Sequence, residues 1–173
     1  MDLSDMRFPR QLEIDYDPEV IRQALMGRTG KLWSGGDLDI PMIRMSDLLN
    51  KALQKAMVEG HIRCGFEAAS DRLKNERAGI THARERDGVF HGERISRLIL
   101  VSNDGTERLY WHVEQLIRSH MPRLLGCLLD MDGSALGRLI NGRERQTKVV
   151  LMEHKDAVSE ALRAIIDGYQ STG

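Results

Sequence analysis

The spacing of apolar residues divides the chain into a regular body from residue 46 onward and a less regular segment before it. Between Ser46 and Gly60 apolar residues recur every three or four positions, which predicts a helix that Ser46 caps and Gly60 ends. The same spacing after Gly65 predicts a second helix. Residues 77–95 are polar and contain three glycines, a pattern that predicts a hairpin or a mobile loop.

The body then alternates between apolar runs and helical patterns. Three runs that are apolar throughout predict buried strands near residues 97–102, 123–129 and 148–152, and helices are expected near 107–119, after a cap at Ser134, and near 155–167. Strands without a polar face need helices on both sides of the sheet. The predicted fold class is therefore α/β, a three-layer α/β/α sandwich with a mixed, mostly parallel central sheet of about four strands. Six side chains are expected to be nearly inaccessible: Leu98, Leu100, Leu125, Cys127, Val149 and Leu151.

The first forty-five residues have a different character. Asp17 and Pro18 predict the capped start of a short helix, which ends near Gly27. Residues 27–39 are rich in glycine and predict a loop with an exposed Trp33. We therefore divide the chain into an acidic N-terminal extension, 1–45, with a short helix and a Gly-rich loop, and an α/β/α sandwich domain, 46–173.

Composition adds little to this picture. With 173 residues, 41% apolar and 29% charged, the chain matches an ordinary globular protein, and no apolar run is long enough to predict a membrane contact. The N-terminus lacks the pattern of a secretory signal. Cys64 and Cys127 stand far apart in apolar surroundings, so we expect reduced core thiols and a cytoplasmic protein.

Charge is unevenly distributed along the chain. The net charge of −1 gives no overall indication of nucleic-acid binding. Residues 1–19, however, carry six acids against two arginines, a net charge of −4, which leaves +3 on the rest. The acidic segment is a candidate docking feature for a protein partner, or a cover for a basic face.

One basic segment, "ALGRLINGRERQTKVV" (residues 135–150), leads directly into the last predicted strand. It holds four cations against Glu144, a net charge of +3. Gly142 would let the backbone approach a ligand closely, and arginine forks suit phosphate oxygens. Such contacts would hold a nucleic-acid backbone without reading its sequence. The alternative is a solvated turn in which Gly142 only ends a short helix.

Three segments of residues 46–168 resemble the ribosomal L-seven-Ae / L-thirty-e family of RNA-binding proteins. "CGFEAASDRLKNERAG" is similar to the segment in which a glycine opens an RNA-contacting helix. "LILVSNDG" is similar to the family's first strand, and "LGRLINGRERQTKVV" resembles its Leu-Gly, glycine and arginine run before the last central strand. The order of predicted elements is that of the family as well.

The resemblance implies that the chain grips structured RNA between the basic loop and the start of the glycine helix, with no catalysis and no cofactor. It implies the following RNA-binding residues: Gly65, Phe66, Glu67, Arg72, Lys74, Arg138, Gly142, Arg143, Arg145 and Lys148. Family members that bind kink-turns usually carry an Asn-Glu pair after the glycine and one further residue. Here the stretch is Gly65-Phe66-Glu67-Ala68, without that asparagine, and both the 1–45 segment and the 77–96 insertion have no counterpart.

Two other functions stay open at this point. Asp104, Asp130 and Asp132 follow apolar strands, where α/β proteins bind ligands, so a nucleotide- or metal-dependent enzyme is one alternative. No GxGxxG or GKS/T motif supports it, and His82 and His91 lack zinc-type spacing, so we expect no metal. The other alternative is a protein-interaction module of the same fold, which would bind a partner through the acidic extension.

Overall fold

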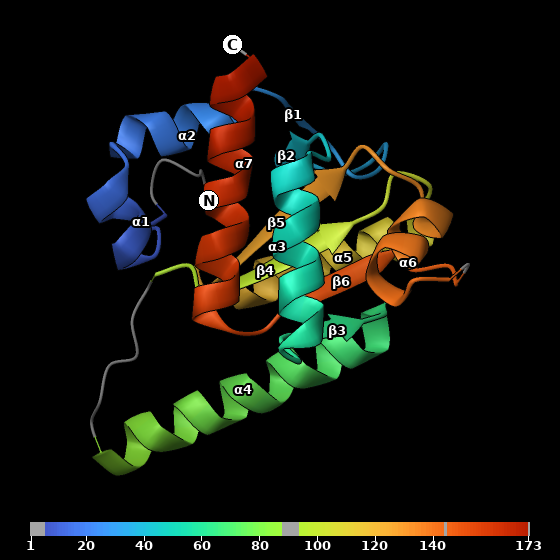
Figure 1. Cartoon of the computed structure of the whole chain (residues 1–173). Helices are drawn as coiled ribbons and strands as arrows, with labels where there is room; N and C mark the ends of the chain where they lie inside the picture. Colours follow the sequence, from blue (N-terminus) through green and yellow to red (C-terminus); the bar gives the residue numbers. More distant parts are fainter. Residues whose placement is uncertain (1–5, 88–93, 144, 173) are drawn as a thin grey trace.

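The computed structural model describes residues 6–87, 94–143 and 145–172, and these ranges hold seven helices and six strands (Figure 1). In chain order the elements are α1 (Arg10–Asp15), α2 (Pro18–Met26), β1 (Thr29–Gly30), β2 (Ile40–Ile43), α3 (Asp47–Val58), β3 (Ile62–Cys64), α4 (Phe66–Asp87), β4 (Arg97–Val101), α5 (Glu107–His120), β5 (Leu124–Leu129), α6 (Gly133–Asn141), β6 (Val149–Met152) and α7 (Lys155–Thr172). No helix in these ranges has the combination of length and apolar character that a membrane crossing requires.

The strands form one mixed sheet in the order β1-β2-β5-β4-β6-β3. β5 pairs in parallel with β2 and with β4, whereas the other three pairings are antiparallel. β6 therefore runs against β4, with Val149 opposite Val101 and Met152 opposite Leu98. As a consequence, β2, β3, β4 and β5 all end where β6 begins. We call this side of the sheet the carboxyl edge and the opposite side the amino edge.

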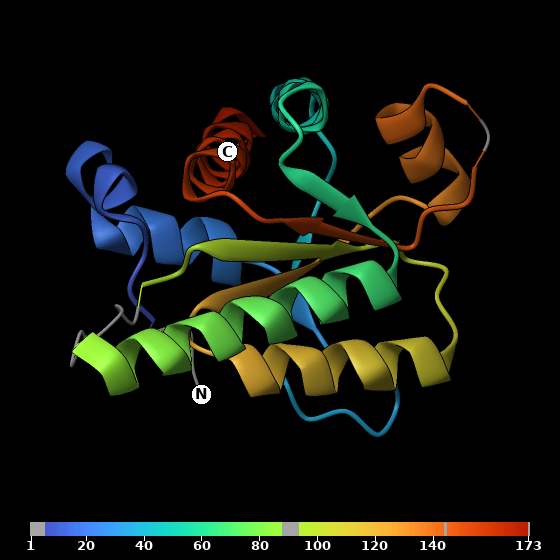
Figure 2. The ribbon, with the colours of Figure 1, turned by 90° about the horizontal axis from the view of Figure 1, so that it is seen from below.

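Helices cover both faces of the sheet (Figure 2). α4 and α5 lie against one face, and α3, α6 and α7 lie against the other (Figure 2). The protein has two apolar cores, one on each face of the sheet, and successive residues of β4 point into them alternately. Leu98 and Leu100 point into one core, and Ile99 and Val101 point into the other. This alternation is the period of a pleated strand, and it explains why the strands are apolar throughout.

The predicted α/β class is confirmed. The three predicted strands are β4, β5 and β6, and they are neighbours in the sheet. The side chains expected to be inaccessible are at most 3% exposed: Leu98, Leu100, Leu125, Cys127, Val149 and Leu151. Cys64 is different, because it lies exposed at the end of β3, and the prediction of a core thiol is wrong for this residue.

The sheet is larger than predicted and less parallel. It has six strands where about four were expected, and two of its five pairings are parallel. The additional strands β1, β2 and β3 are two, four and three residues long. Such short strands show no apolar run of their own in the sequence, and β2 even contains Pro41.

The hairpin or mobile loop predicted for residues 77–95 is wrong as far as Asp87, because α4 continues to that residue without a break. Residues 88–93 lie outside the described ranges. Beyond Leu73 no described side chain of α4 is fully buried, and the helix extends past the sheet (Figures 1 and 2). A helix surrounded by solvent needs no apolar stripe, so the sequence gives no periodic signal there.

Residues before 46 contribute to the same sheet and core. The carboxylate of Asp17 accepts a hydrogen bond from the Glu19 amide at 2.9 Å and caps α2, as predicted. Phe8 and Leu12 are at most 1% exposed and pack in the cluster that also contains Leu98. The short helix predicted after Ser134 is α6, but its cap is Asp132, which accepts from the Ala135 amide at 2.8 Å.

The central position of β4 makes Leu100 a test of the fold. Replacing Leu100 with Ala should lower the free energy of unfolding by about 2–5 kcal/mol, because a fully buried side chain leaves a cavity. Chemical denaturation measures the change. Val58→Ala is the control, since Val58 is 88% exposed and should change stability by less than about 0.5 kcal/mol. Equal effects of the two substitutions would contradict the assignment of β4 as a central strand.

Candidate nucleic-acid interface

The two segments predicted to bind RNA meet at the carboxyl edge. β3 pairs with β6, with Cys64 opposite Val150, and the Gly65 amide donates a hydrogen bond to the Val149 carbonyl at 2.8 Å. Gly65 has a φ of +95°, a left-handed conformation that favours glycine and turns the chain from β3 into α4. The start of α4 therefore lies directly beside the loop that enters β6.

The first turn of α4 offers unpaired backbone donors at this place. The helix makes its first internal hydrogen bond from the Ala69 amide to the Gly65 carbonyl, at 3.1 Å. The amides before Ala69 have no partner within the helix, which is the usual state of a helix N-terminus and favours a nearby anion.

The loop between α6 and β6, residues 142–148, is fixed at both ends. Gly142 ends α6 with a φ of +71°, and its amide donates to the Arg138 carbonyl at 2.9 Å. At the other end, the Thr147 amide donates to the Gly133 carbonyl at 2.9 Å, and the Thr147 side chain is buried. The loop is thus part of the folded body although its middle is exposed.

Gly137 determines how closely this loop approaches α6. A Cβ atom placed on Gly137 would lie 1.5 Å from the Arg145 carbonyl oxygen, so only glycine permits the observed approach. The Leu-Gly pair of the sequence, Leu136 and Gly137, hence has two separate roles. Leu136 is fully buried in the core. Gly137 has no side chain, so the loop backbone can lie directly against α6.

Two arginines of the loop remain free to bind a ligand. The side chains of Arg143 and Arg145 are exposed and have no hydrogen bond or ion pair with any described residue. Arg145 lies close enough to Cys64 for its charge to act on the thiol: burial raises the pKa of Cys64, and the Arg145 guanidinium opposes that rise. The charge of this exposed arginine therefore acts on Cys64, the last residue of β3 before Gly65.

Lys148 is already bound to the protein at the same edge. Its Nζ donates to the backbone carbonyl of Asp104 at 2.9 Å. The Asp104 carboxylate in turn accepts hydrogen bonds from the Ser102 hydroxyl at 2.8 Å and from the Gly133 amide at 2.9 Å. Burial alone would raise the pKa of Asp104, but these hydrogen bonds and the Lys148 charge outweigh it and lower the pKa below its ordinary 3.8.

The remaining residues predicted on α4 divide into different roles. Phe66 is half-buried and lies beside His112, with ring centroids 5.7 Å apart and ring planes tilted by 44°, so it anchors the helix. Glu67 is exposed beside Gly65. Arg72 is held by two carboxylates, with its Nε 3.2 Å from both Glu76 and Glu153.

Lys74 and Arg138 lie at greater distances from the meeting point of the two segments. Lys74 is exposed and stands on α4 about 14 Å along the helix axis from Gly65. It lines a shallow groove together with Arg77, Thr81 and His82. Arg138 is exposed on α6, one turn before Gly142, and makes an interaction of its own within the protein.

The sequence did not reveal Arg63, which belongs to the same surface. It lies in β3, and its Nε donates to the Glu153 carboxylate at 2.9 Å, while half of its side chain stays exposed. A three-residue strand between two helices gives no recognisable period, so its pairing with β6 was not predictable. Among the described residues, no group of three His, Cys, Asp or Glu side chains is placed to hold a metal ion.

No protein-family model and no curated protein sequence matches the chain. Among solved structures, the chain is similar to a protein of unknown function from Bacillus halodurans C, with 18% identity, a TM-score of 0.49 and coverage of 71% of this chain and 99% of that one. It is also similar to the 15.5kD RNA binding protein of Giardia lamblia, with 15% identity, a TM-score of 0.48 and coverage of 73% and 87%. At such low identity the function has to be argued from this chain's own residues.

Gly137 provides a test of the loop position. Gly137→Ala should destabilise the protein by roughly 1–3 kcal/mol, because the Arg145 carbonyl has to move away from the added methyl group. The free energy of unfolding measures this change. Gly79→Ala is the matched control: Gly79 is an exposed helical residue of α4 whose Cβ would meet no atom within 4 Å, so alanine should leave stability unchanged or raise it. A Gly137→Ala protein as stable as wild type would show that the close approach is not required.

Asp104 provides a test by pH. Because its pKa is lower in the folded protein than in the unfolded chain, its contribution to stability is present at neutral pH and is lost as pH falls below 3.8 through the folded-state pKa. Asp104→Asn should therefore lower the melting temperature at pH 7, and its difference from wild type should shrink toward pH 2. A difference that stays constant over this range would exclude the ionised carboxylate as its source.

Proposed function

We propose that the chain binds structured RNA through the carboxyl edge, with Arg143 and Arg145 on phosphate groups and the first amides of α4 facing the same strand. The observation that carries the proposal is the hydrogen bond between the Gly65 amide and the Val149 carbonyl. It joins two segments that are about eighty residues apart and that the family resemblance predicts to grip RNA together. Backbone amides and arginine forks are both suited to phosphate oxygens.

The chemistry of this surface favours recognition of the RNA backbone and shape. Phosphate contacts position a protein on nucleic acid, while base contacts read the sequence. No asparagine follows Gly65, and Phe66 points into the core, so the side chains at the start of α4 are not arranged to read base pairs. We therefore expect an RNA that presents a shaped backbone, contacted also by Arg138 and, further along α4, by Lys74.

The enzyme alternative is less favoured by the geometry. Of the three aspartates that follow strands, Asp104 is occupied by Ser102 and Gly133, and Asp132 caps α6. Both carboxylates are thus used to hold the carboxyl edge together. Their hydrogen bonds give two of the three strand-end aspartates a structural role.

The docking alternative is less favoured as well, because acids of the extension bind cations of the body. Glu13 pairs with Arg94 at 2.9 Å, and Asp15 pairs with Arg163 at 2.5 Å. Trp33 was predicted to be exposed, but it is half-buried and its indole Nε1 donates to Glu114 at 3.2 Å. These side chains stabilise the protein's own packing and leave less for a partner.

The proposal predicts the behaviour of a double variant. Arg143→Ala with Arg145→Ala should weaken binding of structured RNA of any sequence, since both side chains contact phosphates. The slope of log K against log salt should become shallower by about one unit for each phosphate contact that is lost. Anisotropy titrations at several salt concentrations measure both quantities.

The matched control removes two exposed cations elsewhere, Arg10→Ala with Lys51→Ala, so the net charge changes equally. It should keep the wild-type slope, because these residues lie on α1 and α3, away from the loop. Both variants should melt within a few degrees of wild type, since all four side chains are exposed. Identical affinity and slope for wild type and the loop variant would refute the proposed surface.

A further inference from the structure

The sheet is split at the amino edge, between β2 and β5. The two strands pair only at Met42 with Leu128 and at Ile43 with Leu129. Toward the amino edge, β5 continues back to Leu124 along β4, while β2 continues back to Ile40 along β1. Between these strand beginnings the sheet has a gap, although β2 and β5 remain neighbours in it.

A single residue, Pro41, explains why the pairing stops. The Asp130 amide donates to the Ile43 carbonyl at 2.9 Å, so the even-numbered residues of β5 direct their backbone groups toward β2. The next bond of this parallel ladder would run from the amide of residue 41 to the carbonyl of Gly126. Residue 41 is proline and has no N–H, so this bond cannot form.

Gly126 is left with both backbone groups facing the gap. Its N–H and its C=O have no hydrogen bond with β2, and no other described residue takes their place. Buried backbone groups are nearly always paired, so a ligand that offers both an acceptor and a donor would satisfy the two groups of Gly126. Gly126 itself is fixed by packing, because a Cβ atom there would lie 2.3 Å from Ile117 Cδ1.

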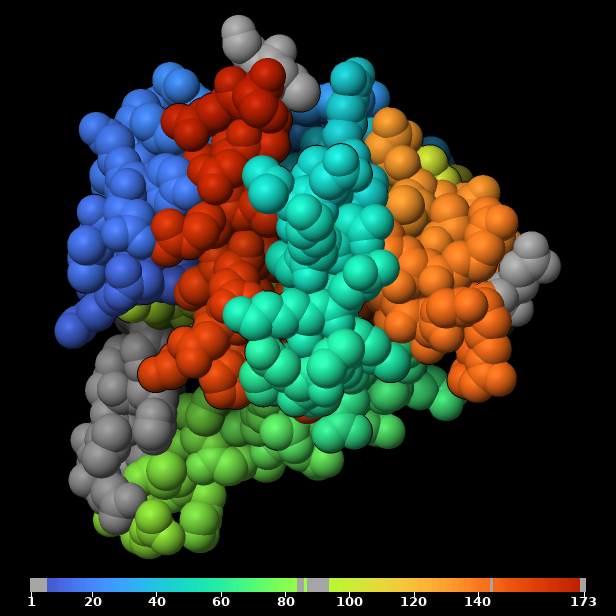
Figure 3. Space-filling model, viewed as in Figure 1, coloured from blue at the N-terminus to red at the C-terminus, as the bar shows by residue number. Residues whose placement is uncertain are grey.

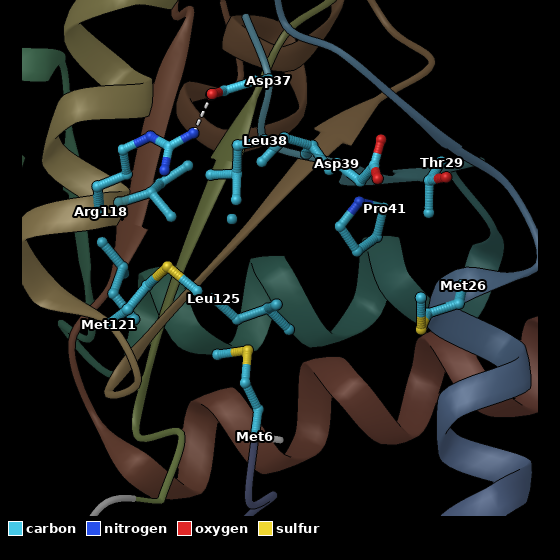
Figure 4. Close-up of a pocket in the computed structure, with 14 residues that line it drawn as sticks. Met6, Met26, Thr29, Asp37, Leu38, Asp39, Pro41, Arg118, Met121 and Leu125 are labelled. Carbon is cyan, nitrogen blue, oxygen red and sulfur yellow. Dashed lines mark hydrogen bonds and ion pairs between the residues drawn. The ribbon is translucent and has the colours of Figure 1, made fainter. Parts of the chain in front are cut away.

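The gap contains a slot of about 480 Å³ (Figure 4). Its wall combines apolar side chains with polar ones. Leu38, Pro41, Leu125 and the methionines Met6 and Met121 lie around it, together with the polar side chains of Thr29, Asp37, Asp39 and Arg118 (Figure 4). This volume lies within the range of roughly 300–1,000 Å³ that small-molecule sites occupy. The slot is also where the two cores of the protein meet, since Met6 belongs to one and Leu38 to the other.

The mouth of the slot is polar. The Asp37 carboxylate and the Arg118 guanidinium form an ion pair at one end, and Thr29 lies toward the other end, with Asp39 between them (Figure 4). Asp39 is bound to Lys31 at 2.7 Å. The carboxylates of Asp37 and Asp39 and the Thr29 hydroxyl can accept hydrogen bonds from hydroxyls at the rim, whereas Gly126 offers its backbone N–H and C=O further inside.

We propose that this slot binds a planar heterocycle that presents a hydrogen-bond acceptor and donor side by side, as the edge of an adenine base does. The ring edge pairs with the N–H and C=O of Gly126, and its faces lie between methionines, whose sulfur atoms make favourable contacts with aromatic rings. A ribose attached to the ring reaches the carboxylates at the mouth.

An inserted peptide strand fits the slot less well. Only residues 124–126 of β5 are free on this side, a length of about 10 Å at 3.3 Å per residue, because the pairing with β2 closes the gap at Leu128. A strand added to a sheet gains its affinity from a series of backbone bonds. One donor and one acceptor on a single residue match a compact ring better.

Adenosine is the probe that tests this site. We expect it to give a saturable calorimetric titration and to raise the melting temperature by on the order of 5–10 °C at a hundredfold excess over Kd. N6,N6-dimethyladenosine keeps the ring but lacks the donor, so it should bind about fivefold more weakly, the equivalent of one hydrogen bond. Equal binding of both nucleosides, or no binding of adenosine, would overturn the proposal.

Pro41→Val tests the role of the split itself. Valine supplies the missing N–H, so the ladder can extend to Gly126 and close the slot. The variant should melt at the wild-type temperature or above, and it should no longer respond to adenosine. Pro18→Ala is the control, because it changes a proline at the start of α2, outside the slot.

Met26→Trp closes the slot in a second way and covers the case in which Pro41→Val fails to fold. Met26 lines the slot and is 39% exposed, so a larger side chain can fill the space from outside without disturbing the core. Adenosine binding that survives in both variants would place the ligand elsewhere and overturn the proposal.

The base could come from a free nucleoside or from a single-stranded RNA, and an oligoadenylate distinguishes the two. If RNA supplies the base, the oligonucleotide should bind more tightly than adenosine, and both Pro41→Val and Met26→Trp should weaken it. If the ligand is a free nucleoside, these variants should abolish adenosine binding and leave oligonucleotide binding unchanged. The slot does not depend on the loop arginines, so loss of RNA binding in the Arg143/Arg145 variant leaves this test unaffected.

Discussion

The direction of β6 is the constraint on which the candidate interface depends. A third parallel strand beside β4 would be entered at the amino edge, and the loop before it would lie far from the other strand ends. Because β6 runs against β4, the loop from 142 to 148 enters at the carboxyl edge instead. β3 then pairs with β6 in the opposite direction and brings Gly65 to the same place. The basic character of the loop and the glycine at the start of α4 thus become one surface through strand direction alone.

This constraint also indicates how much the sequence could predict. Strands β4, β5 and β6 were predictable because each is buried on both faces, which makes a continuous apolar run unavoidable. Their direction was not predictable from such runs, because a strand buried on both faces has the same apolar pattern whether it pairs in parallel or antiparallel. The loop arginines were recognised from composition, but their position beside Gly65 depends on β3, a three-residue strand without any pattern. Arg63 was missed for the same reason.

The segment before residue 46 shows how local charge can mislead. Its acids suggested a docking feature for a partner or a cover for a basic face. Instead, Asp15 binds Arg163 on α7, and Glu13 binds Arg94 just before β4. Exposed ion pairs of this kind contribute little stability each. The larger contribution comes from Phe8, Leu12 and Ile21, which are buried in the main core. Apolar residues among acids are easily overlooked in a sequence, because too few occur in succession to set a period.

The two edges of the sheet differ in whether the backbone groups at the strand ends are hydrogen-bonded to a neighbouring strand. At the carboxyl edge three backbone amides just after strand ends donate to a neighbouring segment: Ser102 to Lys148, Asp130 to Ile43 and Gly65 to Val149. These bonds fix the backbone from which the loop extends, while the side chains of Arg143 and Arg145 stay exposed. At the amino edge Pro41 removes one donor, and the sheet opens beside Gly126. A proline in a paired strand removes one hydrogen bond of the ladder. Its presence at the position facing Gly126 therefore favours a ligand site that uses the unpaired backbone groups, and not a strand that simply ends there.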